Sequence, residues 1–298
     1  MSDFDLPQYL SERRKLVDEA LERFLPAEHA PPSSVHRAMR YSVLAGGKRL
    51  RPILVIAGAE AVGGGAELVL PTACALELIH TYSLIHDDLP AMDDDDYRRG
   101  RLTNHKVFGE AMAILAGDAL LTLAFNLVAG NAAQGGEARV ICDVVAEIAT
   151  AAGTGGMVGG QVVDIESEGK TITVETLEYI HSHKTAALIR ASLRAGARLA
   201  GAKPDALRAI TDTGDRLGLA FQIVDDILDV EGSLEELGKT AGSDERKRKA
   251  TYPALYGLEA SRARARALIQ EAKLALRSLG PRGEPISALA DFILERRS

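Results

Sequence analysis

Aromatic residues are scarce in this chain of 298 residues, which has no tryptophan and only 4% Phe, Trp and Tyr together. Strands are enriched in aromatic and β-branched residues, whereas alanine, which is abundant here, favours helices. An all-β protein is therefore excluded. Apolar residues make up 46% and charged residues 26% of the chain, an ordinary globular composition that also excludes a mainly disordered protein.

Cysteine is equally scarce, and Cys74 and Cys142 match neither a zinc-ligand spacing nor a disulfide framework. Both lie in apolar sequence, so we expect buried, free thiols in a reducing compartment. The N-terminus lacks the basic and apolar regions of a secretory signal. The nearly uncharged stretch 119–136 contains Asn, Gln and several Gly. We expect it to form a buried core helix without membrane insertion, in a cytoplasmic protein.

Basic residues are outnumbered, with 35 Lys and Arg against 42 Asp and Glu, a formal charge of −7. This balance argues against nucleic acid as a partner. Nine of the aspartates gather in two short segments, and without them the balance would be −7 + 9 = +2. The acidity is therefore concentrated at two places in the sequence.

Apolar residues recur at helical spacing along almost the whole chain. The breaks are short and contain Gly or Pro, none resembles a domain linker, and no fixed-period repeat is present. We therefore predict an all-α, single-domain helical bundle covering residues 1–298. The expected helices are 10–25, 33–44, 53–62, 68–89, 111–129, 139–152, 174–199, 205–228, 252–258, 259–279 and 286–295.

The first acidic segment, residues 87–96, holds six aspartates and follows the apolar helix expected at 68–89. Carboxylates at the inner end of a core helix are costly unless they are paired or bind metal. On an unbroken helix Asp87 and Asp93 would lie roughly 120° apart. Pro90 should end the helix near Leu89, which allows both carboxylates to turn toward one point.

The second acidic segment places Asp225 and Asp229 four residues apart, on one face of an apolar helix, with Asp226 beside them. Like charges at this spacing destabilise a helix unless a cation lies between them. Clustered carboxylate oxygens suit Mg²⁺, which commonly binds phosphates as well.

Three cations follow the glycine pair in segment 46–51, Gly-Gly-Lys-Arg-Leu-Arg. It is not a Walker A loop, because Ser42 stands where the first Gly belongs. The Gly-rich segment 153–160 likewise fails as a dinucleotide loop, and close helix packing is its expected role. With the acidic segments, the cations predict a diphosphate-binding wall; the further cations are Arg98, Arg99, Lys184, Lys239 and Lys249.

A rival interpretation comes from two Glu-x-x-His pairs, Glu77 with His80 and Glu178 with His181. This spacing occurs in di-iron carboxylate helical bundles, which include oxidoreductases. Matches this short arise by chance, and a di-iron site would leave both aspartate segments without a role. It remains a distant alternative.

Taken in order, these motifs resemble the trans-prenyl diphosphate synthases, most closely their bacterial farnesyl diphosphate synthases. The resemblance spans nearly the whole chain, through Gly46–Pro52, Asp87–Asp93, Arg98–Gly100, His183–Thr185, Phe221–Asp229, Gly238–Thr240 and Thr251–Pro253. It implies an all-α bundle around a deep central cavity, usually as a homodimer. The implied reaction joins isopentenyl diphosphate head-to-tail to dimethylallyl or geranyl diphosphate, giving (2E,6E)-farnesyl diphosphate and diphosphate. A geranyl or geranylgeranyl diphosphate synthase is the alternative within the family, and two complete aspartate motifs disfavour a non-catalytic subunit.

The resemblance also assigns roles to individual residues. It implies three Mg²⁺ ions per active site, with Mn²⁺ as a substitute, held by Asp87, Asp88, Asp93 and Asp225, while Asp226 and Asp229 support them. The allylic diphosphate would be bound by Arg98, Lys184, Thr185, Gln222, Lys239 and Lys249. Isopentenyl diphosphate would lie at Gly47, Lys48, Arg51, His80 and Arg99. The residues implied as catalytic are Asp87, Asp93, Arg98, Lys184, Asp225 and Lys239.

Product length is assigned by the resemblance to Tyr82 and Ser83, five and four residues before Asp87. A lone Tyr on an apolar helix is usually core, but an aromatic here, with the Leu89-Pro90 insertion, resembles the C15 synthases. Ala186 departs from the family, where many members have Gly. The basic run 246–249 is expected to be a lid or a solvated loop.

Overall fold

The computed structural model describes residues 4–231 and 251–296. Within them the chain is helical apart from one two-stranded hairpin, which confirms the predicted all-α class. In chain order the elements are α1 (Leu6–Phe24), α2 (Ser33–Val43), α3 (Leu50–Ala61), α4 (Ala66–Asp87), β1 (Tyr97–Arg98), β2 (Arg101–Leu102), α5 (Asn104–Phe108), α6 (Glu110–Gly130), η1 (Asn131–Gln134), α7 (Ala138–Ala152), α8 (Met157–Ser167), α9 (Val174–Ile180), η2 (His181–Ala186), α10 (Ala187–Leu199), α11 (Pro204–Glu231), α14 (Tyr252–Tyr256), α15 (Leu258–Leu276), η3 (Arg277–Gly283) and α16 (Glu284–Glu295).

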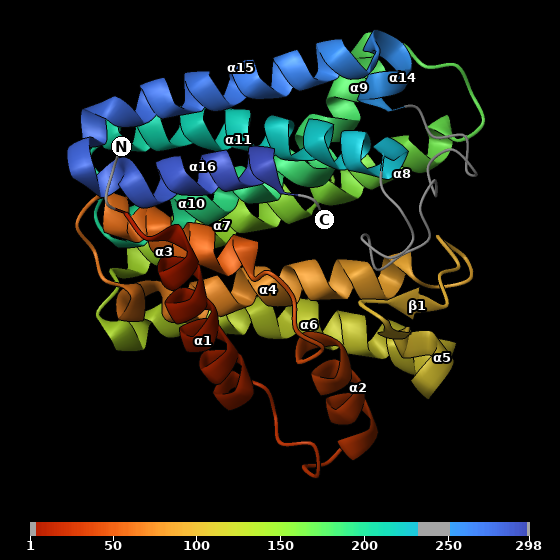
Figure 1. Ribbon diagram of the computed structural model, residues 1–298. Helices are drawn as coiled ribbons and strands as arrows, with labels where there is room; N and C mark the ends of the chain where they lie inside the picture. Colours follow the sequence, from red (N-terminus) through yellow and green to blue (C-terminus); the bar gives the residue numbers. More distant parts are fainter. Residues whose placement is uncertain (1–3, 232–250, 297–298) are drawn as a thin grey trace.

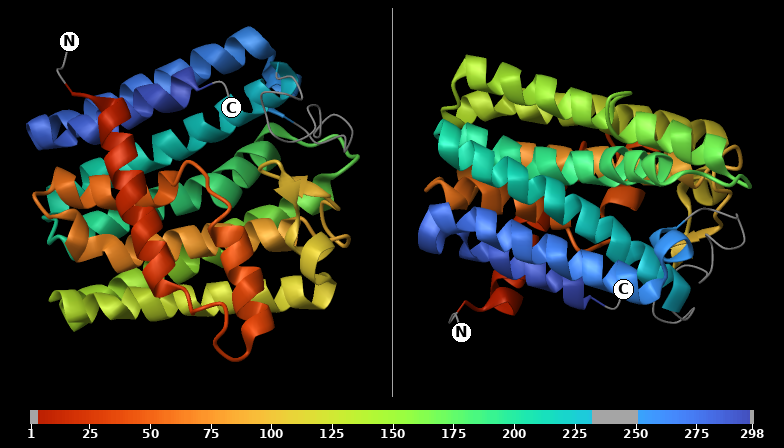
Figure 2. Two further views of the ribbon diagram at one scale, coloured as in Figure 1. Left: turned by 60° about the horizontal axis from the view of Figure 1, so that its bottom comes forward. Right: turned by 90° about the horizontal axis from the view of Figure 1, so that it is seen from above.

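The long helices lie side by side in a bundle, while α1 runs steeply across them (Figures 1 and 2). Helices α3 and α10 form its central wall, because each buries side chains in both apolar clusters of the core. On α3, for example, Ile56 faces one cluster and Leu54 the other. Glycine makes the close approach of these helices possible, since a Cβ at Gly196 would lie 1.8 Å from the carbonyl oxygen of Val55.

The C-terminal ends of α4 and α11, which carry the two aspartate motifs, lie at the same end of the bundle as the β1–β2 hairpin (Figure 1). The hairpin pairs Arg98 with Arg101. Its two-residue turn is Arg99-Gly100, and both residues have positive φ, of 53° and 73°. That is the backbone geometry that matches the right-handed twist of a tight hairpin.

Several helix bounds differ from the predicted ones. Helix α4 ends at Asp87, two residues before the expected Leu89, and the single helix expected at 174–199 is interrupted by the π-helical segment η2. Helices α5 and α8 were not expected. Both follow polar or Gly-rich stretches in which apolar periodicity is weak.

Two burial predictions were wrong. Cys142 is exposed, although Cys74 is buried as expected. The stretch 119–136, which forms the second half of α6 and η1, is not fully buried: Thr122 and Asn126 are exposed, whereas Leu120 and Val128 are buried. By length and hydropathy alone, three helical stretches among the described residues could cross a membrane, Ala66–Asp87, Glu110–Gln134 and Ala138–Ser167. The first is mostly buried in the bundle, whereas the other two expose much of their apolar surface.

Candidate active site

The end of α4 folds back on itself, as the break at Pro90 predicts. The backbone N–H of Asp93 donates to the carbonyl oxygen of Asp87 at 2.8 Å, which places these two residues side by side. The amide of Gln161, on α8, donates to Asp87 Oδ1 at 3.1 Å. Asp87 therefore sits between its own loop and α8.

Asp88 is held differently, because its side chain is buried against Arg98 of the hairpin. Arg98 Nε donates to Asp88 Oδ1 at 2.6 Å, and the same guanidinium lies 3.3 Å from Asp95 Oδ2. Burial raises the pKa of Asp88 to about 7, although Arg98 acts in the opposite direction. The carboxylate of Asp88 thus fixes the arginine that follows the acidic loop.

In the second motif Asp226 is held by partners from three segments. It accepts from Gln222 Nε2 at 2.9 Å and from the backbone N–H of Tyr252 at 2.7 Å, and His181 Nε2 lies 3.3 Å away. This carboxylate joins α11 to η2 and to the start of α14. Asp229 is also buried.

Asp225 points instead to the C-terminal end of the chain. Arg296 Nη2 donates to Asp225 Oδ1 at 2.7 Å and to the carbonyl oxygen of Phe221 at 2.8 Å. The guanidinium also lies 3.8 Å from the centre of the Phe221 ring. The Arg296 side chain is only 6% exposed, so the last described residue is built into the acidic site.

The π-helical segment η2 carries Lys184 and Thr185 between α8 and α11. Lys184 Nζ lies 2.6 Å from Asp164 Oδ2 on α8, and Thr185 Oγ1 donates to Gln222 Oε1 on α11 at 2.7 Å. Glycine permits this fit. A Cβ at Gly160 would lie 2.3 Å from the Lys184 backbone nitrogen, which agrees with the packing role expected for segment 153–160.

The residues predicted to bind isopentenyl diphosphate gather around Arg99. This arginine donates to the carbonyl oxygen of Gly46, and a Cβ at Gly47, where φ is 134°, would lie 2.7 Å from the guanidinium carbon. Loss of surrounding water, Arg51 and Arg99 together lower the pKa of His80 well below 6.5. His80 is therefore neutral at pH 7.

Lys48 and Arg51 connect this basic group to the second aspartate motif. Desolvation and Arg296 lower the pKa of Lys48, while Asp225 acts to raise it. The pKa of Arg51 is lowered by burial and, more weakly, by Arg99, again with Asp225 opposing the shift. Lys48 and Arg51, two of the three cations predicted from segment 46–51, thus interact electrostatically with Asp225 on α11.

Arg49, the other cation of that segment, has a different role. It is 3% exposed and donates to Glu77 Oε1 and to Asp18 Oδ1, both at 2.8 Å. Glu77 is therefore the buried counterion of Arg49, and His181 lies against Asp226. Both Glu-x-x-His pairs have a member committed to another contact, which removes the geometric basis for a di-iron site.

Tyr82 lies under the first motif and is 7% exposed. Its ring meets that of His86 edge to face, with centres 5.7 Å apart, and burial raises the pKa of its hydroxyl to about 12. His86 Nε2 in turn lies 3.1 Å from the carbonyl oxygen of Ile114 on α6. The hydroxyl of Ser83 donates to the carbonyl oxygen of His80 in its own helix.

A small cavity of about 40 Å³ lies next to this motif, where α4 faces the hairpin and the end of α2. Its lining includes Thr81, Leu84, Asp88, Arg98 and Arg99.

Lys239, Lys249 and the basic run 246–249 lie outside the described residues. Conversely, three residues of the site were missed in the sequence. Gln161 and Asp164 lie on the unexpected helix α8. The sequence signal that could have revealed them is their three-residue spacing directly after a Gly-rich segment. Arg296 had none, because nothing in the sequence places the C-terminal end near residue 225.

Comparison with known proteins decides the family. The polyprenyl synthetase family model matches residues 32–276. The chain belongs to the polyprenyl synthetase family.

A dimethylallyltranstransferase of Fischerella ambigua (strain UTEX 1903) is 50% identical over 98% of this chain and 84% of its own length. The farnesyl diphosphate synthase of Geobacillus stearothermophilus is 46% identical over 99% of both chains. The crystal structure of a geranylgeranyl pyrophosphate synthetase from Pyrococcus horikoshii covers 98% of each chain, with a TM-score of 0.87 and 34% identity. Membership confirms the resemblance to trans-prenyl diphosphate synthases and supports prenyltransferase activity.

Proposed function

We propose that this protein is a Mg²⁺-dependent farnesyl diphosphate synthase, which joins isopentenyl diphosphate to dimethylallyl and then geranyl diphosphate. The observation that carries the proposal is that the helix ends with the two aspartate motifs lie at one end of the bundle, where Lys48 and Arg51 interact electrostatically with Asp225. Carboxylates for a divalent cation and cations for phosphate oxygens are the two donor sets that a pair of diphosphates requires.

The donor chemistry of the acidic residues fits Mg²⁺, a hard cation that prefers oxygen ligands. Asp87 and Asp93, which are joined by a backbone hydrogen bond, are both partly exposed, and Asp225 is half exposed. An ion can therefore reach these carboxylates. Bound Mg²⁺ would neutralise charge developing on the departing diphosphate. Asp88 would contribute chiefly by holding Arg98 in place.

The chain's own residues would then perform three tasks. Arg98, Lys184 and Lys239 would stabilise the leaving diphosphate as the allylic carbon–oxygen bond breaks. Lys48, Arg51 and Arg99 would hold isopentenyl diphosphate so that its double bond attacks the allylic carbocation. The apolar interior would keep water from that cation, and the released diphosphate would take up the proton lost from the new chain.

We assign the C15 product to Tyr82. The ring is buried one to two turns below Asp87 and is supported by His86, which rests against α6. A supported ring at this depth would block a growing chain more firmly than a small side chain. A geranylgeranyl product remains an alternative, because relatives named as farnesyl and as geranylgeranyl synthases both resemble this chain. A geranyl product is the other alternative within the family.

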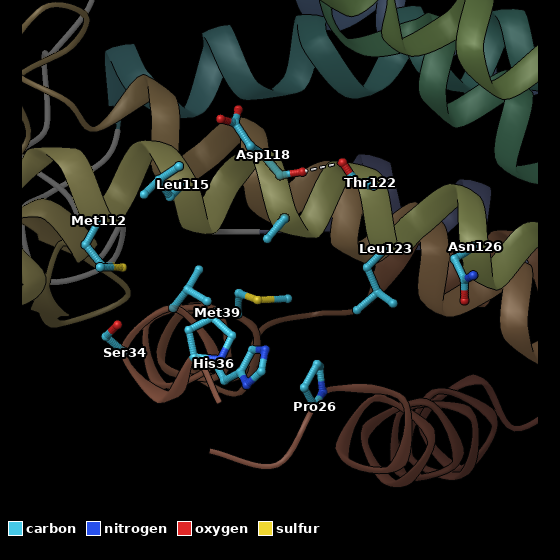
Figure 3. Close-up of a pocket in the computed structure, with 13 residues that line it drawn as sticks. Pro26, Ser34, His36, Met39, Met112, Leu115, Asp118, Thr122, Leu123 and Asn126 are labelled. Atoms are coloured by element: carbon cyan, nitrogen blue, oxygen red, sulfur yellow. Dashed lines mark hydrogen bonds between the residues drawn. The ribbon is translucent and has the colours of Figure 1, made fainter. Parts of the chain in front are cut away.

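The active form we propose is a homodimer of one-domain protomers. Helices α3 and α10 bury side chains in both core clusters, which supports a single domain. An apolar groove of about 790 Å³ lies between α6 and the segment around α2, where Met112, Leu115 and Leu123 face Pro26, His36 and Met39 (Figure 3). With the exposed side chains of Ile114 and Leu115 on α6, this groove gives the kind of apolar surface that marks a subunit contact.

The test is a product assay. Purified protein would be incubated with Mg²⁺, labelled isopentenyl diphosphate and either dimethylallyl or geranyl diphosphate, and the products separated by chain length. We expect a C15 product from both primers, with turnover lost in Asp87→Asn and retained in Asp212→Asn, an exposed aspartate of α11. No product from either primer would refute the proposed enzyme, and a C10 or C20 product would refute its chain length.

A further inference from the structure

The loop around the β1–β2 hairpin contains a second group of possible metal ligands, separate from those implied for the diphosphate site. Asp94 and Asp96 precede the hairpin, and His105 follows it on α5. One ligand atom from each of these three residues lies within 4.8 Å of the others. Both aspartates are exposed, whereas His105 is 6% exposed.

His105 is oriented as a metal-binding histidine would be. Thr103 Oγ1 donates its single proton to the carbonyl oxygen of Asp95 at 2.8 Å, so it can only accept from His105 Nδ1, 3.2 Å away. The proton of a neutral imidazole is thereby assigned to Nδ1, and the lone pair to Nε2. Nε2 is buried and has no hydrogen-bond partner within residues 4–231 and 251–296.

A buried nitrogen lone pair without a partner is costly. A hydrogen bond that fixes the opposite ring nitrogen is the usual outer support of a metal-ligating histidine. The hydrogen bond at Nδ1, the lone pair of Nε2 and the two carboxylates occur together around this hairpin. A divalent cation would satisfy the imidazole and reduce the repulsion between the aspartates.

We propose that Asp94, Asp96 and His105 form a binding site for a first-row transition-metal dication of the Zn²⁺ class. One imidazole nitrogen and two carboxylates suit Zn²⁺ or Co²⁺, while Mg²⁺ prefers oxygen ligands alone. The site clamps the two ends of the hairpin that carries Arg98 and Arg99. The inference does not rest on the proposed reaction, because none of the three ligands belongs to the residues implied for the diphosphate site.

Lys106 is the resident competitor for this cation. Its Nζ lies 2.6 Å from Asp96 Oδ1, and that hydrogen bond raises the lysine pKa. A metal would share or displace this contact. Removing the lysine charge therefore distinguishes two possibilities: the loop binds a metal cation, or it is an acidic segment that Lys106 alone neutralises.

The experiment is a Co²⁺ titration followed by visible absorption, without diphosphate and with excess Mg²⁺ to occupy oxygen-only sites. We expect one Co²⁺ per chain with an imidazole-type spectrum, displaced by Zn²⁺ and unchanged in the Asp87→Asn/Asp225→Asn variant. Binding should weaken at least tenfold in His105→Gln and tighten in Lys106→Met. The matched control, His29→Gln, removes an exposed histidine and should bind as the parent protein does.

Because His105 is buried, its variant could fail to fold, and circular dichroism would reveal this. The Asp94→Asn/Asp96→Asn variant changes only exposed side chains and decides the question in that case. Equal Co²⁺ affinity in the parent protein and this variant would overturn the proposal, as would the absence of stoichiometric binding in the parent.

Discussion

Replacing Gly160 by alanine tests whether the fit between α8 and η2 positions the catalytic groups. A Cβ there would lie 2.3, 2.7 and 2.8 Å from the backbone nitrogen, Cα and Cβ of Lys184. The shortest contact falls 3.4 − 2.3 = 1.1 Å below ordinary van der Waals contact. All three atoms belong to or adjoin the backbone, so a rotamer change cannot relieve the clash, and α8 and η2 must separate.

The effects on stability and on turnover should differ in size. Overpacking costs about 1–3 kcal/mol, and alanine regains about 1 kcal/mol over glycine inside a helix. The free energy of unfolding should therefore fall by at most about 2 kcal/mol. A displacement of roughly 1 Å between groups that orient a substrate can cost on the order of 100-fold in rate. The hydrogen bond of Gln161 to Asp87 and the ion pair of Lys184 with Asp164 are the contacts that this displacement would change.

The assay compares kcat and the thermal unfolding midpoint of Gly160→Ala with those of Gly130→Ala. Gly130 is the last residue of α6, has φ of −61°, and a Cβ there would meet nothing within 4 Å. The control should keep its turnover and gain up to about 1 kcal/mol. A Gly160→Ala protein with kcat within twofold of the control would refute the positioning argument.

Three further variants test other parts of the account. Tyr82→Ala removes the proposed floor, so products longer than C15 should form; an unchanged chain-length profile would refute that role. His80→Gln removes an imidazole whose pKa is lowered on folding. Below about pH 6.5 the unfolded chain takes up a proton there that the folded protein does not, so His80 lowers the free energy of unfolding as pH falls. The slope of unfolding free energy against pH, at most about 1.4 kcal/mol per unit for one group, should flatten there; an unchanged slope would contradict the shift. Arg296→Met removes the hydrogen bond to Asp225 Oδ1, so half-maximal turnover should need about threefold less Mg²⁺. An unchanged Mg²⁺ concentration at half-maximal turnover would show that the Arg296 guanidinium and Mg²⁺ do not compete for Asp225.

Local patterns predicted much of this fold, because apolar periodicity reports which helix faces are buried. The break after Asp87 followed from Pro90, and the meeting of residues 87 and 93 followed from that break. Helix α8 was missed because glycines weaken periodicity. The exposure of α6 was missed as well. An apolar helix has the same sequence pattern whether its side chains are buried in the core of its own chain or lie on the surface.

The site was only partly predictable, for a related reason. Motif residues such as Asp87 and Lys184 are recognisable in the sequence, but the contacts between distant segments are not. The hydrogen bond between Arg296 and Asp225 joins residues 71 positions apart, and no local pattern predicts it. From the sequence, Arg49 likewise resembles one more phosphate ligand. The structure shows instead that it pairs with the buried Glu77 and with the partly exposed Asp18.

The central claim, that two distant aspartate motifs form a single Mg²⁺-dependent diphosphate site, can be measured by calorimetry. Inorganic diphosphate would be titrated into the parent protein, Asp87→Asn and Asp225→Asn, with and without Mg²⁺. The account predicts Mg²⁺-dependent binding in the parent that weakens at least tenfold in each variant alone. Parent-like binding in Asp225→Asn, or equal affinity without Mg²⁺, would contradict it.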